Sequence, residues 1–304
     1  MDQHLQVFVT VVEKQNFSRA AEELHMTQPA VSQYIRTLES NIGTRLLERS
    51  NKYVRLNKVG EIVYHHAKEI LGLYTKMQTL VDDVTNVASG PISIGASYTF
   101  GEYVLPHIIA NLQETYPDIQ PTVTIGNTTE IASLVDTHQL DVGIVEGHSK
   151  DQKLMVEAFA DDQMVVVAAP ISVLSNEQGF INIDALAEQT WIVREKGSGT
   201  REATEKMFGQ LGIRPAKLMS FGSTQPIKES VEAGLGISLM SKWAIQKELK
   251  NGDLCTLKVT GLPFTRQFSI VTKSPFQTKA LEVFIALLRN NKPLTTLEDM
   301  KKPQ

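Results

Sequence analysis

The chain has one cysteine among its 304 residues, Cys255, so no disulfide can form within it. This usage is typical of a reducing cytoplasm, and we interpret Cys255 as a packed thiol in a strand rather than a reactive one. No apolar run is long enough to span a membrane, and the N-terminus does not resemble a signal peptide. These absences predict a cytoplasmic protein that makes no membrane contact.

The sequence also lacks the short motifs that accompany common catalytic chemistry. It contains no phosphate-binding P-loop, no G-x-G-x-x-G, no H-E-x-x-H, no G-x-S-x-G and no paired-cysteine metal motif. His65 and His66 are adjacent and lack the usual spacing of metal ligands, so we interpret both as helix-surface residues. The sequence therefore predicts no enzyme, no metal site and no cofactor.

Basic charge is scarce overall but concentrated near the N-terminus. The formal net charge is −4, yet residues 1–60 hold eight Lys/Arg and six Asp/Glu, which gives +2. Residues 28–60 alone hold six basic and two acidic residues, which gives +4. A local basic excess of this kind is typical of a segment that contacts nucleic acid.

Residues 17–39 predict two short amphipathic helices joined by a tight break, the pattern of a DNA-reading helix-turn-helix. The apolar positions repeat at helical spacing in Ala20, Ala21 and Leu24, and again in Val31, Ile35 and Leu38. Thr27 is expected to cap the second helix, and Pro29 falls in its first turn, where a missing N–H is harmless. The exposed side chains of this helix are Gln28, Ser32, Gln33 and Arg36, which can bond base edges and phosphates. The alternative is an ordinary helical hairpin in a core.

The flanking segments complete a winged domain over residues 1–58. A first helix with Leu5, Phe8, Val9 and Val12 on one face is expected to cover the other two. Residues 45–56 predict two short strands around 50–52, a wing from which Arg49 and Lys52 reach phosphates or a minor groove. The alternative is a solvated basic turn.

Residues 59–89 predict one long linker helix, because glycine is rare there and proline absent. Its apolar residues recur at steps of four and three: Val63, Ala67, Ile70, Tyr74, Met77, Val81, Val84 and Ala88. Such a seam needs a partner, and a second copy of the chain is the simplest one. Packing against the chain's own C-terminal domain is the alternative.

Residues 90–304 alternate strands with helices and predict a largely parallel α/β domain in two lobes. We expect one lobe over 90–162 and 266–292 and the other over 163–265, with crossovers near 162 and 265. Among its elements we expect strands over 92–96 and 164–168 and single helices over 101–115 and 201–211. Ligands of such sheets lie in the crevice between the lobes.

Three loops with hydroxyls or glycines lead into helices of this domain: 95–101, 126–130 and 195–201. Helix N-termini of this kind bind anions well, so a small anion or organic acid is the expected ligand. The candidate residues are Ser97, Thr99, Asn127, Thr128, Ser198, Gly199, Thr200, Arg201 and Gln225. The alternative is that each hydroxyl caps only its own helix.

The chain resembles the LysR-type transcriptional regulators over nearly all its length. The residues that carry the resemblance are Phe17-Ser18-Arg19-Ala20-Ala21, Leu24, Thr27-Gln28-Pro29-Ala30-Val31-Ser32, Ile35, Leu38-Glu39, Gly43, Leu46-Leu47-Glu48-Arg49 and Gly60. Looser matches lie at Pro106, Asp141-Val-Gly and residues 231–240. Asn57 replaces the threonine that the family usually has before the linker helix, but asparagine also caps helices.

The resemblance implies a winged helix-turn-helix, a dimerising linker helix and a two-lobed effector domain like that of periplasmic binding proteins. It also implies double-stranded DNA as a partner, dimers or tetramers, a small-molecule effector that changes DNA bending, and RNA polymerase as a further partner. Base contacts are then expected from Gln28, Pro29 and Gln33, and backbone contacts from Ser18, Arg19, Thr27, Ser32, Arg36, Arg49 and Lys52. Relatives with a similar 197–201 loop control sulfur assimilation or carbon fixation, which suggests a sulfur oxyanion or small organic acid. The alternative function is small-molecule binding with architectural DNA binding and no effector-dependent switch.

Overall fold

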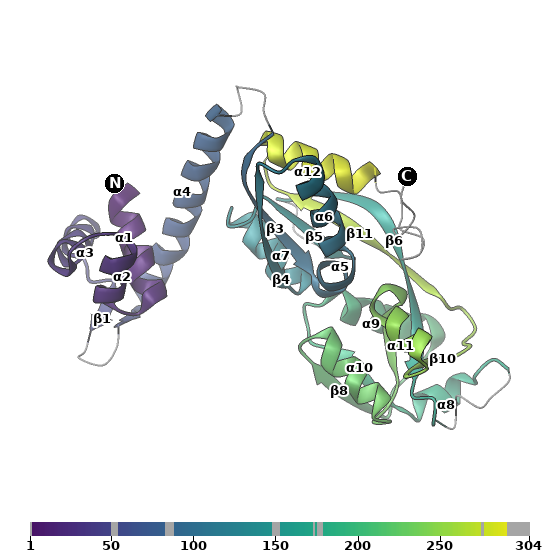
Figure 1. Ribbon diagram of the computed structural model, residues 1–304. Coiled ribbons are helices and arrows are strands. Elements are labelled where there is room, and N and C mark those ends of the chain that lie inside the picture. Colours follow the sequence, from purple (N-terminus) through teal and green to yellow (C-terminus); the bar gives the residue numbers. More distant parts are fainter. Residues whose placement is uncertain are drawn as a thin grey trace. The chain divides into compact units, whose positions relative to one another are not determined.

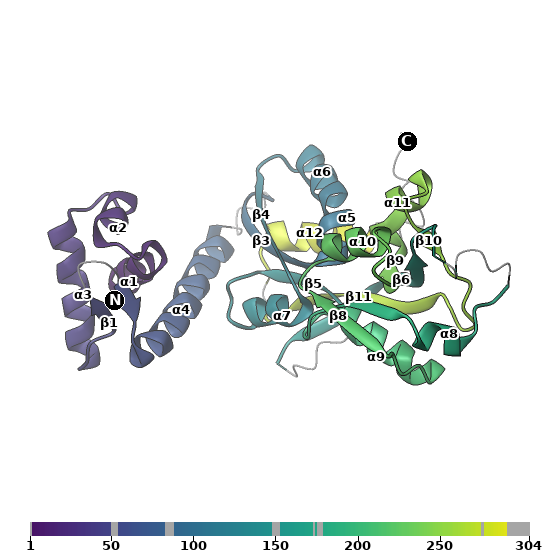
Figure 2. The same cartoon turned by 90° about the horizontal axis from the view of Figure 1, so that it is seen from below.

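The computed structural model describes residues 2–49, 54–82, 88–147, 153–172, 174, 179–274 and 277–290. The chain folds into two compact units, one over residues 1–84 and a larger one over most of 85–304. Figures 1 and 2 show the elements of each unit from two directions.

The smaller unit is a three-helix cluster with a two-stranded wing. Its elements are α1 (Asp2–Lys14), α2 (Phe17–Glu23), α3 (Gln28–Ile42), β1 (Leu47–Arg49) and β2 (Val54–Leu56), and the two strands pair antiparallel. The expected apolar positions do form the core, where Phe8, Val31 and Ile35 are fully buried. The helix-turn-helix and its wing, predicted from the sequence, are therefore confirmed as folded elements.

Side-chain caps set the helix boundaries of this unit. The Asn16 carboxamide oxygen accepts from the backbone N–H of Ser18 at 2.8 Å and begins α2. The Thr27 hydroxyl accepts from the N–H of Ala30 at 3.4 Å, which confirms its expected capping role at α3. Gly43 ends α3 at φ +84°, a left-handed conformation that glycine adopts without a steric penalty.

The linker helix is α4 (Lys58–Asp82), with 25 residues. Asn57 caps it, since its side-chain oxygen accepts from the N–H of Gly60 at 2.8 Å. The helix was expected to continue to residue 89, and this is wrong for its last two residues, because Ala88 and Ser89 are not helical. Residues 83–87 lie outside the described residues. Ala88 instead packs on the core of the first lobe, so it belongs to the larger unit rather than to the seam.

The first lobe of the larger unit has three layers. Its sheet contains β3 (Gly90–Ser97), β4 (Ile119–Gly126), β5 (Val142–Glu146) and parts of β6 (Met155–Ala168) and β11 (Phe264–Thr272), in the order β6-β11-β5-β3-β4. The helices are α5 (Tyr98–Tyr103), α6 (Leu105–Thr115), α12 (Lys279–Asn290) and α7 (Thr128–Asp136). The first three share one core cluster, while α7 packs in a separate cluster with Val145 and Val271.

The second lobe is built around the other halves of β6 and β11. It adds α8 (Ile183–Ala187), β7 (Thr190–Arg194), α9 (Gly199–Leu211), β8 (Lys217–Phe221), α10 (Thr224–Glu232), β9 (Ser238–Ser241), η3 (Lys242–Ile245), α11 (Gln246–Asn251) and β10 (Cys255–Thr256). Cys255 is half-buried and its thiol faces the carbonyl of Ala168 at 3.4 Å, so it is a packed strand thiol as expected.

Two long antiparallel strands connect the lobes. The expected crossovers near residues 162 and 265 are β6 and β11, which pair continuously except for a register shift after Phe268. The strand expected over 164–168 therefore begins nine residues earlier, at Met155. The helix expected over 101–115 is two helices, because Pro106 lies in the first turn of α6 and cannot continue the helix before it.

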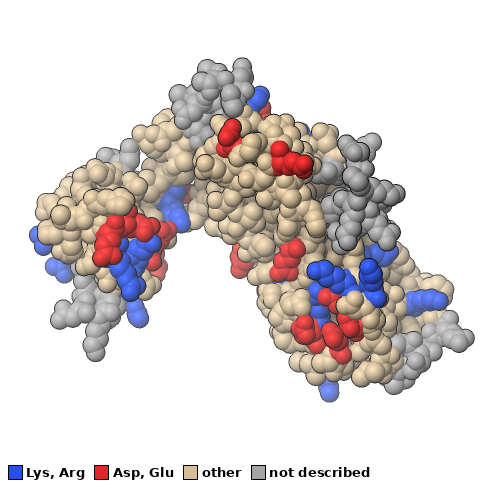
Figure 3. All heavy atoms as spheres, in the orientation of Figure 1, with Lys and Arg blue, Asp and Glu red and all other residues tan. Residues whose placement is uncertain are grey.

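Among the described residues, no helix combines the length and apolarity that crossing a membrane requires. Figure 3 shows that uncharged residues form most of the described surface of the larger unit on the visible face. Acidic and basic side chains lie close together on that face of both units.

Candidate functional site

The first candidate surface is the exposed side of α3. Gln28, Gln33 and Arg36 are exposed, as are Thr27 and Pro29 at its start. The Gln28 carboxamide donates to the Ser32 hydroxyl at 2.9 Å, which joins two groups with the polarity needed for base and phosphate contacts. The opposite side of α3 is buried, so only this side is available to a ligand as large as DNA.

The remaining expected DNA contacts lie beside α3 or outside the described residues. Ser18 and Arg19 are exposed at the start of α2, where their backbone N–H groups are already held by Asn16. Arg49 is the last residue of β1, on the wing, but its side chain lies outside the described residues. Lys52 falls in the undescribed wing tip.

The second candidate site is a buried ionic network at the junction of the lobes. Strand register builds it: β11 places Arg266 opposite Asp162 of β6, and Phe268 opposite Glu146 of β5. Because side chains alternate along a strand, Arg266 and Phe268 share a face of the sheet, and both carboxylates lie beside the guanidinium. Arg266 donates from Nε to Asp162 at 2.7 Å and from Nη1 to Glu146 at 2.9 Å.

The two carboxylates respond differently to burial. Burial raises the pKa of Asp162 above its ordinary value, and the pull of Arg266 and the Ser241 hydroxyl does not fully offset it. For Glu146 burial acts in the same direction, but Arg266 and hydrogen bonding from Thr99 outweigh it and lower the pKa. Glu146 is therefore the firmly ionised partner of Arg266.

Hydroxyls from both lobes converge on this network. Arg266 donates from Nη2 to Thr99 of α5 at 3.2 Å and from Nη1 to Thr200 of α9 at 3.0 Å. The Ser97 Oγ is buried beside the Glu146 carboxylate, and together with Thr99 it helps to lower the pKa of that carboxyl. Ser97 is therefore a further polar group at the network.

A small cavity adjoins the network. Its lining includes Thr99, Thr200, Thr224, Ser241 and Arg194, and its volume is about 10 Å³. A space of this size holds one water molecule at most.

Lobe-to-lobe contacts account for the small size of the cavity. The Arg194 guanidinium lies 4.3 Å from the centre of the Tyr98 ring. Its Nε also donates to the Glu195 carboxylate at 2.7 Å. Nearby, the Lys228 ammonium lies 5.0 Å from the ring centre of Tyr103. Both tyrosines belong to α5 of the first lobe, whereas both cations belong to the second lobe. These contacts therefore hold the two lobes together.

Most of the other candidate residues bond within their own helices, whereas Thr128 contacts the strand that carries Glu146. Asn127 and Glu130 exchange side-chain-to-backbone hydrogen bonds at the start of α7, and the Ser198 hydroxyl accepts from the N–H of Thr200. Thr128 donates to the backbone carbonyl of Glu146 at 3.2 Å. Arg201 donates to the Glu205 carboxylate at 2.6 Å, and the Gln225 carboxamide donates to Glu229 at 2.8 Å. The structure thus brings Ser97, Thr99 and Thr200 together but leaves the others at the edge.

Gly199 has a steric role that the sequence did not indicate. A Cβ on it would lie 2.3 Å from the backbone oxygen of Glu146, so only glycine lets α9 approach β5 this closely. We expect Gly199→Ala to lower the free energy of unfolding by about 1–2 kcal/mol through overpacking.

Gly209→Ala is the matched control for this prediction, because it lies in the same helix with nothing within 4 Å of the added Cβ. It should be neutral or stabilise by up to about 1 kcal/mol, since alanine favours helix. Chemical denaturation of both variants gives the comparison, and equal effects would contradict this role for Gly199.

Sequence reasoning missed the charged residues of the network. Glu146 and Arg194 each end a strand after apolar residues, and a charge there is a signal because a buried charge must have a partner. Asp162 and Arg266 lie between polar residues of β6 and β11 and give no such signal. The partners could not be assigned, because they depend on pairings between strands far apart in the sequence.

Comparisons with known proteins agree with this architecture. The family model of the bacterial regulatory helix-turn-helix protein of the lysR family matches residues 3–61, and the LysR substrate binding domain matches 85–293. The chain is 36% identical over 289 residues to the HTH-type transcriptional regulator CysL of Bacillus subtilis, covering 94% of this chain and 96% of that one. It is 35% identical over 270 residues to the regulator CfxR of Cupriavidus necator, covering 89% and 84%.

Solved structures show the same fold. Full-length CbnR in complex with its target DNA aligns with a TM-score of 0.72 at 19% identity, over 95% of this chain and 99% of that one. The regulatory domain of CcmR from Synechocystis, in complex with 2-PG, aligns with a TM-score of 0.62 at 25% identity, over 67% and 100%. With both family models matched, the chain belongs to the LysR family of DNA-binding transcriptional regulators, whose second domain binds small-molecule effectors.

Proposed function

We propose that this regulator responds to a small anionic metabolite that binds at the junction of the two lobes, beside Arg266 and Arg194. The observation that carries the proposal is the convergence of two buried guanidinium groups with the hydroxyls of Thr99, Thr200 and Ser97. Such a set of donors suits a sulfur oxyanion, a phosphate ester or a small carboxylate.

The cavity beside Arg194 and Thr99 has a volume of only about 10 Å³, so binding in it would require the lobes to separate or Glu146 to leave Arg266. Either movement breaks contacts between the lobes, so an effector can shift the equilibrium between two arrangements of the domain. Two structural neighbours support an anionic ligand, since CcmR was solved with 2-PG and QuiR with shikimate, a carboxylate.

A thermal-shift screen of the full chain against sulfate, sulfite, thiosulfate, phosphate, citrate and O-acetylserine tests the proposal. An anion at 100 times its dissociation constant should add about 2.7 kcal/mol to the stability of the larger unit. We expect Ser97→Ala to weaken binding of that anion about tenfold, because the anion loses one hydroxyl donor, whereas Thr115→Ala at the far end of α6 should not. Equal binding by both variants would place the effector elsewhere.

The same proposal covers the DNA and protein partners of the chain. Gln28, Pro29 and Gln33 would contact bases, while Ser18, Arg19, Thr27, Ser32, Arg36, Arg49 and Lys52 would contact the DNA backbone. A regulator that acts on promoters would work in the cytoplasm and, at activated promoters, beside RNA polymerase.

Self-association is supported by three exposed apolar surfaces. On α4, Ile62, Leu73 and Met77 are each about half exposed. Strands β4 and β8 lie at sheet edges and expose Val123 and Leu218. Apolar surface on a long helix and on open edges is the kind that a second copy covers.

We expect Leu73→Lys to weaken the dimer, because it places a charge in the apolar surface of α4. Analytical ultracentrifugation across a concentration series should show a larger monomer fraction than for the wild type. Lys76→Ala on the same helix is a surface control, and identical behaviour of all three proteins would exclude α4 from the interface.

A further inference from the structure

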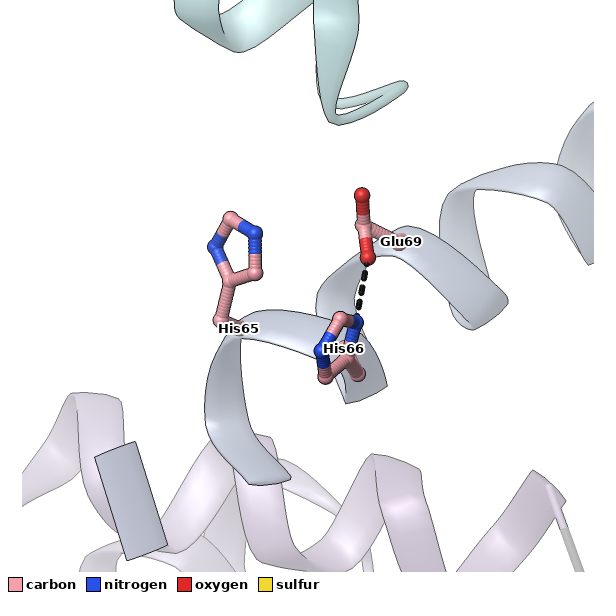
Figure 4. A group of neighbouring side chains, drawn as sticks. All are labelled: His65, His66 and Glu69. Atoms are coloured by element: carbon pink, nitrogen blue, oxygen red, sulfur yellow. Dashed lines mark hydrogen bonds and ion pairs between the residues drawn. The ribbon is translucent and has the colours of Figure 1, made fainter. Parts of the chain in front are cut away.

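Three potential metal ligands lie together on the exposed side of α4. They are His65, His66 and Glu69, and their ligand atoms all lie within 4.8 Å of one another (Figure 4). From the sequence we interpreted both histidines as ordinary surface residues. The helix places them near the same carboxylate, that of Glu69. With 3.6 residues per turn, Glu69 lies about 40° around the axis from His65 and about 60° from His66, so it stands between them one turn later.

The cluster is partly arranged for binding. His66 Nδ1 lies 2.7 Å from the Glu69 carboxylate, and the two imidazole rings have centroids 5.3 Å apart. The dashed line in Figure 4 marks the first contact, and the His65 ring stands beside it on the same side of the helix. His66 is 64% exposed, so a bound ion would keep water in its open positions.

The nearest cation on the helix is held away from this cluster. The Lys68 ammonium donates to Glu13 of α1 at 3.0 Å, and the Tyr64 hydroxyl donates to the same carboxylate. Both side chains therefore fix the neighbouring side of α4 to α1 and leave the cluster facing solvent.

We propose that His65, His66 and Glu69 bind one divalent transition-metal ion, of which Zn²⁺ is the representative, on α4. Two imidazoles and a carboxylate are a donor set that suits Zn²⁺ and its neighbours in the first transition series. Metal-to-ligand distances of about 2.0–2.2 Å require donor atoms roughly 3.4 Å apart in a tetrahedral site. The ligand atoms lie within 4.8 Å of one another, so binding an ion requires them to draw closer by an ångström or so.

The location of the site gives the ion a structural consequence. His66 lies at helical spacing between Ile62 and Leu73, within the exposed apolar surface of α4. An ion bound there ties two turns of α4 together and carries charge into a surface that the proposed dimer would cover. Metal binding and self-association would then influence each other, although the site itself is formed by one chain.

Isothermal titration of the full chain with Zn²⁺ in a buffer without chelators tests the site. We expect saturable binding of one ion per chain, weakened at least tenfold by His66→Ala or Glu69→Gln and lost in the His65→Ala/His66→Ala double variant. His107→Ala, an exposed histidine of α6, is the matched control and should bind as the wild type does.

A second measurement separates metal binding from any effect on folding or assembly. Addition of Ni²⁺ should broaden the NMR signals of His65 and His66 before those of the other histidines. Circular dichroism of the variants should match the wild type, since all three ligands are on the surface. The absence of saturable heat with Zn²⁺, or unchanged binding in the double variant, would overturn the proposal, whatever the oligomeric state.

Discussion

Replacing Arg266 by alanine is expected to destabilise the larger unit by about 3–5 kcal/mol, because it leaves two buried carboxylates without their counter-ion. Arg266, Glu146 and Asp162 have side chains that are 4%, 2% and 0% exposed. Water cannot replace the lost guanidinium at this burial. At roughly 2–4 °C per kcal/mol for a unit of this size, the melting temperature should fall by about 10 °C.

Arg289→Ala is the matched control for this experiment. Arg289 also pairs with a carboxylate through two hydrogen bonds, to Glu157 at 2.6 and 2.9 Å, but both side chains are about half exposed. An exposed pair contributes little to stability, so differential scanning calorimetry should show a small shift. If both variants lowered the melting temperature equally, the residues around Arg266 would not be ionised in the folded protein.

The pH dependence gives an independent check of the same interpretation. In the wild type, the lowered pKa of Glu146 means that its contribution is present above its ordinary pKa and is lost as the pH falls through the lowered value. Without Arg266, burial alone acts on both carboxylates and raises their pKa. They then take up protons as the pH falls, so the deficit of Arg266→Ala should be largest near neutral pH and shrink towards pH 5.

Local patterns in the sequence were sufficient to locate most of the secondary structure. The apolar spacing of Val31 and Ile35 and the capping role of Thr27 depend on residues within one or two turns, and both are found as expected. The same holds for the strand at 92–96 and the helix at 201–211, which differ from β3 and α9 by two residues or fewer at each end.

The lobe junction could not be located in the same way, because it depends on contacts between distant residues. Arg266 meets Asp162 and Glu146 through pairings that span 104 and 120 residues. The polar residues that were expected at the site because of their positions in loops fall into two groups. Ser198 and Asn127 cap their own helices, whereas Thr99 and Thr200 meet the distant guanidinium. The helix-start pattern thus led to two of the hydroxyls that contact Arg266, but not to the charged residues of the network.

Replacing Gln28 by alanine is expected to reduce discrimination between the operator and a mutated operator by about 1–3 kcal/mol, or roughly 5–150-fold. Gln28 is exposed in the first turn of α3, the part of a recognition helix that contacts base edges. Its hydrogen bond to Ser32 at 2.9 Å holds the carboxamide across the helix surface. Alanine removes both the donor and the acceptor that a base pair would use.

The measurement is DNA-binding affinity for an operator selected from a random library with the wild-type protein, and for single-base-pair variants of it. Gln6→Ala, an exposed glutamine of α1, is the matched control and should discriminate as the wild type does. Arg36→Ala should instead weaken all sequences similarly and reduce the salt slope by about 1, because it removes a backbone contact. If Gln28→Ala also weakened all sequences equally, Gln28 would contact the DNA backbone, and base recognition would rest on other residues of α3.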